Sequence, residues 1–170
     1  MAWDGGCFCG ALRFRLRAAP MFVYCCHCTD CQRQTGSAYV VNDQIETEMV
    51  ELLSGEPQGY AMATESGYPH DIFRCPRCGC AVWSDHSRRG WLRFIRIATL
   101  DMPGVFRPEA HIYVRSKLSW VSLEDGIPAF DEYYDMPSLS RRTLPSRRKR
   151  TPNSRATSSP RKERPFKAKL

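Results

Sequence analysis

Hydrophobic and charged residues alternate near the start of the chain. Leu12, Phe14 and Leu16 are separated by arginines, which is the period-two pattern of a strand with one buried face. Later segments are also short and apolar or alternating, and turn-forming residues bound them. We expect strands at residues 12–17, 21–25, 37–41, 50–53, 58–63, 71–75, 91–98, 112–114 and 119–123.

Glycine and proline separate these segments, as in the Ser-Gly-Glu-Pro sequence at residues 54–57. Many short strands with turns between them favour an antiparallel, mainly β domain. The polar segment from Cys26 to Thr35 is predicted to form a short helix. Gly36 follows it, and glycine readily takes the left-handed conformation that ends a helix.

Charge divides the chain of 170 residues into two parts. Residues 1–137 hold 13 Lys+Arg and 17 Asp+Glu, whereas residues 138–170 hold 12 Lys+Arg and one acid, Glu163. The second part has few large apolar side chains, so burial cannot offset the entropy lost on ordering. We predict a single domain over residues 1–137 and a basic disordered tail over residues 138–170. Such a tail suits nucleic-acid phosphates or nuclear import, although a solubilising extension has the same composition.

Two absences in the sequence bear on location. No run of 18 apolar residues is present, which excludes a membrane-spanning helix. The first residues lack the basic and apolar regions of a secretory signal. We therefore expect a cytoplasmic protein, or a nuclear one in a eukaryote. In a reducing compartment the nine cysteines are better explained as metal ligands or catalysts than as disulfides.

Eight of the nine cysteines fall into three sequence groups. These are Cys7 with Cys9, Cys26 with Cys28 and Cys31, and Cys75 with Cys78 and Cys80. A Cys-x-x-Cys turn followed by glycine, as at residues 75–79, supplies half of a tetrahedral zinc site.

Two arrangements would complete that half-site. Cys7 and Cys9 would close it and leave Cys26, Cys28 and Cys31 as a compact three-ligand site with an open fourth position. The reverse use of Cys26 and Cys28 also satisfies the spacing, as do purely structural zinc sites. We prefer the first arrangement.

The other candidate ligands receive no direct role. Cys25 ends an apolar run and is expected to be buried, and Cys80 is expected to neighbour a metal without binding it. We expect His27 to lie at the surface or behind the ligands, and we assign no role to the isolated histidines His70, His86 and His111.

Four motifs, taken together, resemble one protein family. They are Gly6-Cys7-Phe8-Cys9-Gly10, Cys26-His27-Cys28-Thr29-Asp30-Cys31 with Gln32-Arg33-Gln34-Thr35-Gly36, Arg74-Cys75-Pro76-Arg77-Cys78-Gly79, and Asp125-Gly126-Ile127-Pro128-Ala129-Phe130. In their order and spacing, over about residues 3–134, they resemble the glutathione-dependent formaldehyde-activating enzymes, a family that includes centromere protein V.

The resemblance implies a fold, a division of the metal ligands and an activity. The implied fold is a β-tent of coiled antiparallel strands around two zinc ions. Cys7, Cys9, Cys75 and Cys78 would hold the structural zinc, and Cys26, Cys28 and Cys31 the functional one. The implied reaction joins glutathione to formaldehyde, giving S-(hydroxymethyl)glutathione, and its reverse is a carbon–sulfur lyase reaction.

The chemistry fits these residue types. Coordination to a metal deprotonates a thiol and holds it for attack on an electrophile. Glutathione carries two carboxylates, and Arg33, Arg74 or Arg77 could bind one of them through paired hydrogen bonds. We choose Arg33 as the candidate. The alternative functions are a non-catalytic zinc scaffold whose basic tail binds nucleic acid, and a purely structural two-zinc domain.

Overall fold

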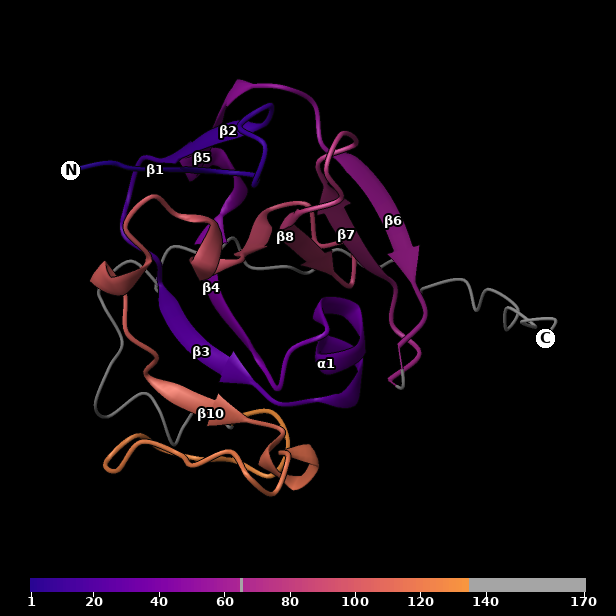
Figure 1. The fold of residues 1–170 in the computed structure, drawn as a ribbon, viewed down its shortest axis with the longest axis vertical. Helices are drawn as coiled ribbons and strands as arrows, with labels where there is room; N and C mark the ends of the chain where they lie inside the picture. The colour runs from indigo at the N-terminus through magenta and orange to yellow at the C-terminus, as the bar shows by residue number, and fades with distance from the viewer. Residues whose placement is uncertain (65, 135–170) are drawn as a thin grey trace, which may run out of the picture.

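The computed structural model describes residues 1–64 and 66–134. Within them, two β-sheets hold most of the regular secondary structure (Figure 1), so the prediction of a mainly β fold is confirmed. The smaller sheet has the strand order β1-β2-β5, and the larger has the order β10-β3-β4-β9-β8-β7-β6. The strands are β1 (Trp3–Gly6), β2 (Arg13–Leu16), β3 (Phe22–Cys26), β4 (Val40–Glu46), β5 (Val50–Ser54), β6 (Gln58–Met62), β7 (His70–Arg74), β8 (Ala81–His86), β9 (Leu92–Ile95) and β10 (Ala110–Ile112).

The helical elements are short. Helix α1 spans Thr29–Thr35, and Gly36 ends it with φ +67°, as predicted. Short 3₁₀ turns occur at Thr47–Met49, Ile97–Thr99, Pro103–Val105 and Val114–Ser116. Figure 1 shows the small sheet at one end of the molecule and β10 toward the other.

One strand pair departs from the antiparallel expectation. Strand β10 pairs with β3 in parallel, with His111 opposite Cys25, while the other named strand pairs are antiparallel. Glu109 makes two hydrogen bonds to Val23 where this pairing begins, one through its backbone and one through its side chain. Its N–H donates to the carbonyl of Val23 at 2.8 Å, and its Oε1 accepts from the N–H of Val23 at 3.1 Å.

Most predicted strands are present, with different ends. Strands β2, β3, β5, β6 and β7 lie where the pattern places them, whereas β4 begins at Val40 and runs further than predicted. The segment 91–98 is a strand only to Ile95, after which the chain turns. The segment 112–114 is likewise shifted, because β10 ends at Ile112 and Tyr113 takes the left-handed conformation with φ +56°.

The predicted strand at residues 119–123 is wrong. This segment is a loop, and the carbonyls of Leu118 and Val121 accept hydrogen bonds from Lys117 Nζ at 3.2 and 2.6 Å. A side chain thus satisfies carbonyl groups that a strand would pair with a neighbour.

The interior is divided into two apolar clusters. One packs the small sheet against the large one, around Phe14, Ile45 and Trp83. The other, around Phe22 and Phe94, also contains Cys26 and Cys31. The three-cysteine group therefore borders a packed core, which restricts the positions that its sulfur atoms can take.

The proposed boundary between domain and tail, residues 137/138, lies outside the described residues, as does the tail itself. Among the residues that the structure describes, no helix is long and apolar enough to cross a membrane.

Candidate metal centres and the thiol cavity

Two loops far apart in sequence bring four cysteines together. Cys7 and Cys9 follow β1, and Cys75 and Cys78 follow β7; their four sulfur atoms lie within 4.8 Å of one another. The Sγ atoms of Cys7 and Cys9 are 3.6 Å apart, and those of Cys9 and Cys75 are 3.8 Å apart. Four thiolates around a zinc ion, each about 2.3 Å from it, would be roughly 3.8 Å apart. The donor set and its spacing thus fit a tetrahedral metal ion.

Backbone hydrogen bonds hold both loops in shape. The N–H of Leu12 donates to Cys7 Sγ at 3.3 Å, which orients this sulfur and favours its thiolate form. The N–H of Gly79 donates to the carbonyl of Cys75 at 2.8 Å, and Gly79 has φ +72°, a conformation that suits glycine. The tight turn keeps Cys75 and Cys78 on the same side of the loop.

The second group forms where β3 ends and α1 begins. Cys26 is the last residue of β3, Cys28 caps the helix, and Cys31 lies in its first turn. Their three sulfur atoms lie within 4.8 Å of one another. Cys28 Sγ accepts a hydrogen bond from the backbone N–H of Cys31 at 3.3 Å, so the same contact caps the helix and orients the thiol.

The thiols of Cys26, Cys28 and Cys31 hydrogen-bond to one another. The hydrogen bonds that Cys28 accepts from Cys26 and Cys31 lower the pKa of the Cys28 thiol to about 3. Of the three cysteines, Cys28 therefore loses its proton most readily. Gln32 holds the loop between Cys26 and Cys28 in place, because its Nε2 donates to the carbonyls of His27 and Ser116 at 2.7 and 2.8 Å.

The three-cysteine group faces a cavity of about 500 Å³, the thiol cavity. Its wall comes from α1, from strands β3, β4, β7, β8, β9 and β10, and from loops next to them. Besides the three cysteines, the residues that line it include Tyr24, Gln34, Asn42, Tyr68, His70, His86, Arg89, Arg96, Tyr113, Arg115 and Tyr133. A volume of this size is typical of small-molecule sites.

A buried arginine lines this cavity. Arg96 is only 5% exposed, and its guanidinium donates to the amide oxygens of Asn42 and Gln34. Both partners are uncharged, and burial lowers the pKa of Arg96 while negative charge on Cys31 would raise it. A buried cation with neutral partners needs a nearby anion, and a Cys31 thiolate would supply one.

The arginines and histidines that line the cavity differ from those chosen from the sequence. Arg33 is exposed on α1, and Arg33, Arg74 and Arg77 do not line the cavity. The arginines that do line it are Arg89, Arg96 and Arg115. His70 and His86, which were assigned no role from sequence, lie together on its wall with ring centroids 5.2 Å apart. Burial lowers the pKa of His70 to about 4, so this ring is neutral at pH 7.

Cys80, Cys25 and His27 lie close to the two cysteine groups in sequence, and all three are at least partly buried. Cys80 is half-buried and packs against the core beside the four-cysteine group, outside the set of four close sulfurs. Cys25 is buried, as expected. His27 is completely buried and makes a hydrogen bond to His111, so it does not lie at the surface.

The fold and site define a mainly β protein with two clusters of cysteines that could bind metal, one of them open to a cavity. The sequence model of the glutathione-dependent formaldehyde-activating enzymes matches residues 2–116. The chain belongs to this family.

A related protein from Halomonas elongata is 26% identical over 129 residues, which cover 73% of this chain and 82% of the relative. Its curated name assigns it, provisionally, as a glutathione-dependent formaldehyde-activating enzyme. A crystal structure of a Rhodobacter sphaeroides protein covers 75% of this chain and 98% of its own, with 17% identity and a TM-score of 0.43.

Proposed function

We propose that the protein joins the thiol of glutathione to formaldehyde, with Cys26, Cys28 and Cys31 holding a functional zinc ion. The product would be S-(hydroxymethyl)glutathione, and the reverse reaction is that of a carbon–sulfur lyase. In the same proposal Cys7, Cys9, Cys75 and Cys78 hold a structural zinc ion. Family membership supports the substrate pair, and the sulfur-only donor sets support zinc.

One observation carries the proposal. The three sulfur atoms of Cys26, Cys28 and Cys31 lie together at the wall of a cavity large enough for a small molecule. Three protein ligands beside a cavity leave a metal ion one position for an outside ligand, whereas four ligands complete a tetrahedron. The two clusters therefore suit different roles, one open to substrate and one closed.

The bound zinc would supply a deprotonated, positioned thiol. The residues of the chain would set the environment for that thiol. Arg96 places a positive charge beside the cysteines, which favours an anionic thiolate over neutral water as the incoming ligand. In the overall reaction the thiol loses its proton, a carbon–sulfur bond forms, and a proton ends on the former carbonyl oxygen.

The carboxylates of glutathione need cationic partners at some distance from the sulfur. Arg89 and Arg115 line the cavity, and Arg115 also pairs with Glu132 at 3.1 Å. We propose Arg89 and Arg115 for this role because an arginine can bind a carboxylate through two parallel hydrogen bonds. Arg33 remains a prediction from sequence.

The test combines metal analysis with calorimetry. We expect two zinc ions per chain by elemental analysis, and saturable glutathione binding by titration calorimetry. Cys28→Ser should abolish glutathione binding while the four-cysteine site keeps its zinc. Cys80→Ser is the matched control and should leave metal content and binding unchanged.

Formaldehyde consumption in the presence of glutathione then tests catalysis, by NMR detection of the hydroxymethyl product. Glutathione binding that persists in Cys28→Ser would show that the thiol does not bind at this group. A protein that binds glutathione without accelerating product formation would be a thiol-binding protein instead of an enzyme.

A further inference from the structure

A second cavity lies on the opposite face of the strands that carry the thiol cavity. Successive side chains of a strand point to opposite faces. On β3, Tyr24 and Cys26 line the thiol cavity, while Cys25 lines the second one. The strand register places Cys25 beside His111 on β10 and Val41 on β4, and both residues also line the second cavity. Its volume is about 320 Å³.

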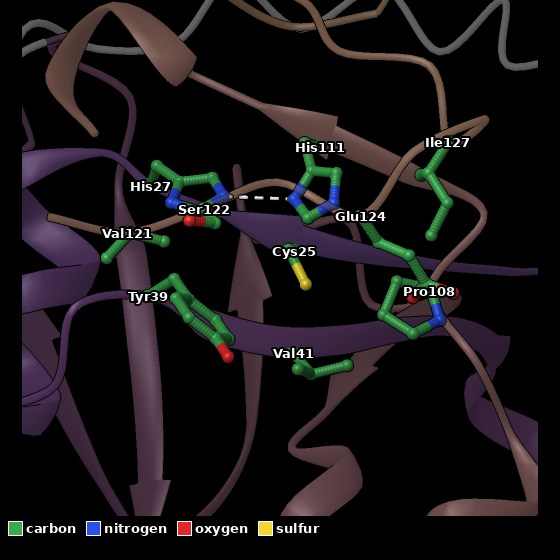
Figure 2. A pocket seen from close by; sticks show the side chains of 10 residues that line it. All are labelled: Cys25, His27, Tyr39, Val41, Pro108, His111, Val121, Ser122, Glu124 and Ile127. Carbon is green, nitrogen blue, oxygen red and sulfur yellow. Dashed lines mark hydrogen bonds between the residues drawn. The ribbon is translucent and has the colours of Figure 1, made fainter. Parts of the chain in front are cut away.

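Two buried histidines form one side of this cavity. His27 Nε2 and His111 Nδ1 are 3.0 Å apart and share a hydrogen bond, drawn as the dashed line in Figure 2. His27 is 0% exposed and His111 7%. The other ring nitrogens, His27 Nδ1 and His111 Nε2, are buried and have no hydrogen-bond partner among the described residues.

The hydrogen bond between the two rings determines what the pair offers to a ligand. A neutral imidazole has one N–H and one lone pair. When one ring donates within the pair and the other accepts, one outer nitrogen is a donor and the other an acceptor. Leaving a buried polar atom without a partner costs roughly 1–3 kcal/mol. The pair therefore favours a guest that can donate or accept a hydrogen bond.

The rest of the wall combines apolar side chains with the hydroxyl groups of Tyr39 and Ser122. Val41, Val121 and Ile127 line the cavity, and Figure 2 shows them arranged around the Cys25 thiol with the His111 ring above it. No lysine or arginine is among its lining residues, so an anion would find no cation there. The one carboxylate is that of Glu124, which is exposed at the rim and already paired with Arg107 at 3.3 Å.

We propose that this cavity is a second binding site, which takes a small uncharged aliphatic molecule through a hydroxyl or carbonyl oxygen. The oxygen bonds to His111 Nε2, and the hydrocarbon part packs on Val41, Val121 and Ile127. Both alcohols and aldehydes have this chemistry. An aldehyde has one further option, because its carbonyl carbon lies near Cys25: the S–H bond breaks, a C–S bond forms, and the proton moves to the carbonyl oxygen. The site is independent of the function proposed above.

The experiment titrates the full-length, zinc-loaded protein with 1-hexanol, and follows the histidine ring nitrogens by two-dimensional ¹H–¹⁵N NMR. We expect saturable shifts of the His27 and His111 ring nitrogens. His70 and His86, which line the other cavity, are internal controls and should not move. Hexanoate and hexylammonium, of the same chain length, should leave all four rings unchanged.

Unchanged His27 and His111 signals at saturating hexanol would overturn the proposal, as would equal shifts of all four rings. Binding of hexylammonium in preference to hexanol would also overturn it, since the site would then be a cation site built on Glu124.

Two variants locate the ligand. His111→Phe removes the bonding nitrogen and should weaken hexanol binding by roughly fivefold to tenfold. Ile127→Trp fills the cavity from a partly exposed loop position, which puts the fold at less risk, and should abolish binding. Hexanol binding that is unaffected by Ile127→Trp would place the ligand elsewhere.

A titration with hexanal shows whether the site prefers aldehydes to alcohols. If aldehydes are the ligand, hexanal binds at least tenfold more tightly than hexanol, and Cys25→Ser removes the difference. If alcohols are the ligand, the two compounds bind alike in the wild type and in Cys25→Ser. Either result supports the site, whereas binding of neither compound overturns it.

Discussion

The two cysteine groups should differ in how much they stabilise the fold. Cys9 and Cys75 are 66 residues apart in sequence, so a metal ion held by the four-cysteine group closes a long loop. Cys26, Cys28 and Cys31 lie within six residues, and a metal ion there closes only a short one. In the chain-entropy treatment of cross-links, closing a loop of about 66 residues raises the free energy of the unfolded chain by roughly 4 kcal/mol. Closing a loop of about six residues raises it by roughly 2 kcal/mol.

The assay compares two double variants by urea unfolding at a fixed free zinc concentration. Cys75→Ser/Cys78→Ser should lower the free energy of unfolding by at least about 4 kcal/mol, because the small sheet is then no longer tied to the β7–β8 loop. Cys26→Ser/Cys28→Ser should lower it by roughly half as much. Elemental analysis should show one zinc ion fewer in each. Equal losses of stability, or a larger loss in Cys26→Ser/Cys28→Ser, would refute the division into a stabilising site and a functional one.

Three further predictions address single features of the chain. Asp43 is fully buried, and burial raises its pKa well above the usual range. As pH rises above about 3.9, this carboxyl therefore ionises in the unfolded chain before it does in the folded one. The free energy of unfolding then falls by about 1.4 kcal/mol per pH unit until the folded pKa is reached. Asp43→Asn should therefore stabilise the protein at pH 8 and not at pH 4, and a difference in urea midpoints that does not change with pH would contradict this. Arg96→Met should retain both zinc ions but weaken glutathione binding by roughly tenfold to a hundredfold in calorimetry, since a positive charge beside the thiolate is lost; unchanged affinity would remove Arg96 from the site. Deletion of residues 138–170 should leave glutathione binding intact and abolish any salt-dependent binding to polynucleotides in a filter assay, and loss of glutathione binding would contradict the division into domain and tail.

The cysteine groups could be predicted from sequence because their members lie close together in the chain. A Cys-x-x-Cys turn fixes two sulfur atoms within one loop, whatever the rest of the protein does. The pairing of Cys7 and Cys9 with Cys75 and Cys78 is different, because spacing alone permitted another partner. The meeting of these loops depends on sheet packing, which the family resemblance implied and the local pattern did not determine.

Two strands escaped the pattern for identifiable reasons. β8 has buried Ser84 and Asp85, which interrupt the apolar alternation. Asp85 can be buried because it accepts hydrogen bonds from Arg93 and from the backbone N–H groups of Arg89 and Gly90. β1 contains two glycines, which disfavour a strand. A Cβ at Gly5 would lie 2.7 Å from the Phe14 ring, so packing requires a glycine at this position. The same glycine weakens the strand pattern in the sequence.

The cavity wall was the least predictable part of the site. His70, His86 and Arg96 come from β7, β8 and the residue after β9, and each is isolated in sequence. Only the order of strands in the sheet brings them to the cysteines. A buried arginine also has no sequence signature, because its partners are two amide side chains on other elements.

The two adjacent cysteines Cys25 and Cys26 show how strand register assigns chemistry in this protein. They are identical in type, yet one faces the thiol cavity and the other the histidine-lined cavity. A shift of β3 by one residue would exchange their faces and remove Cys26 from the three-cysteine group. The contacts of Glu109 with Val23 hold β3 in one register through two hydrogen bonds. The backbone pairing of β3 with β4 and β10 therefore decides which of the two adjacent cysteines joins the three-cysteine group.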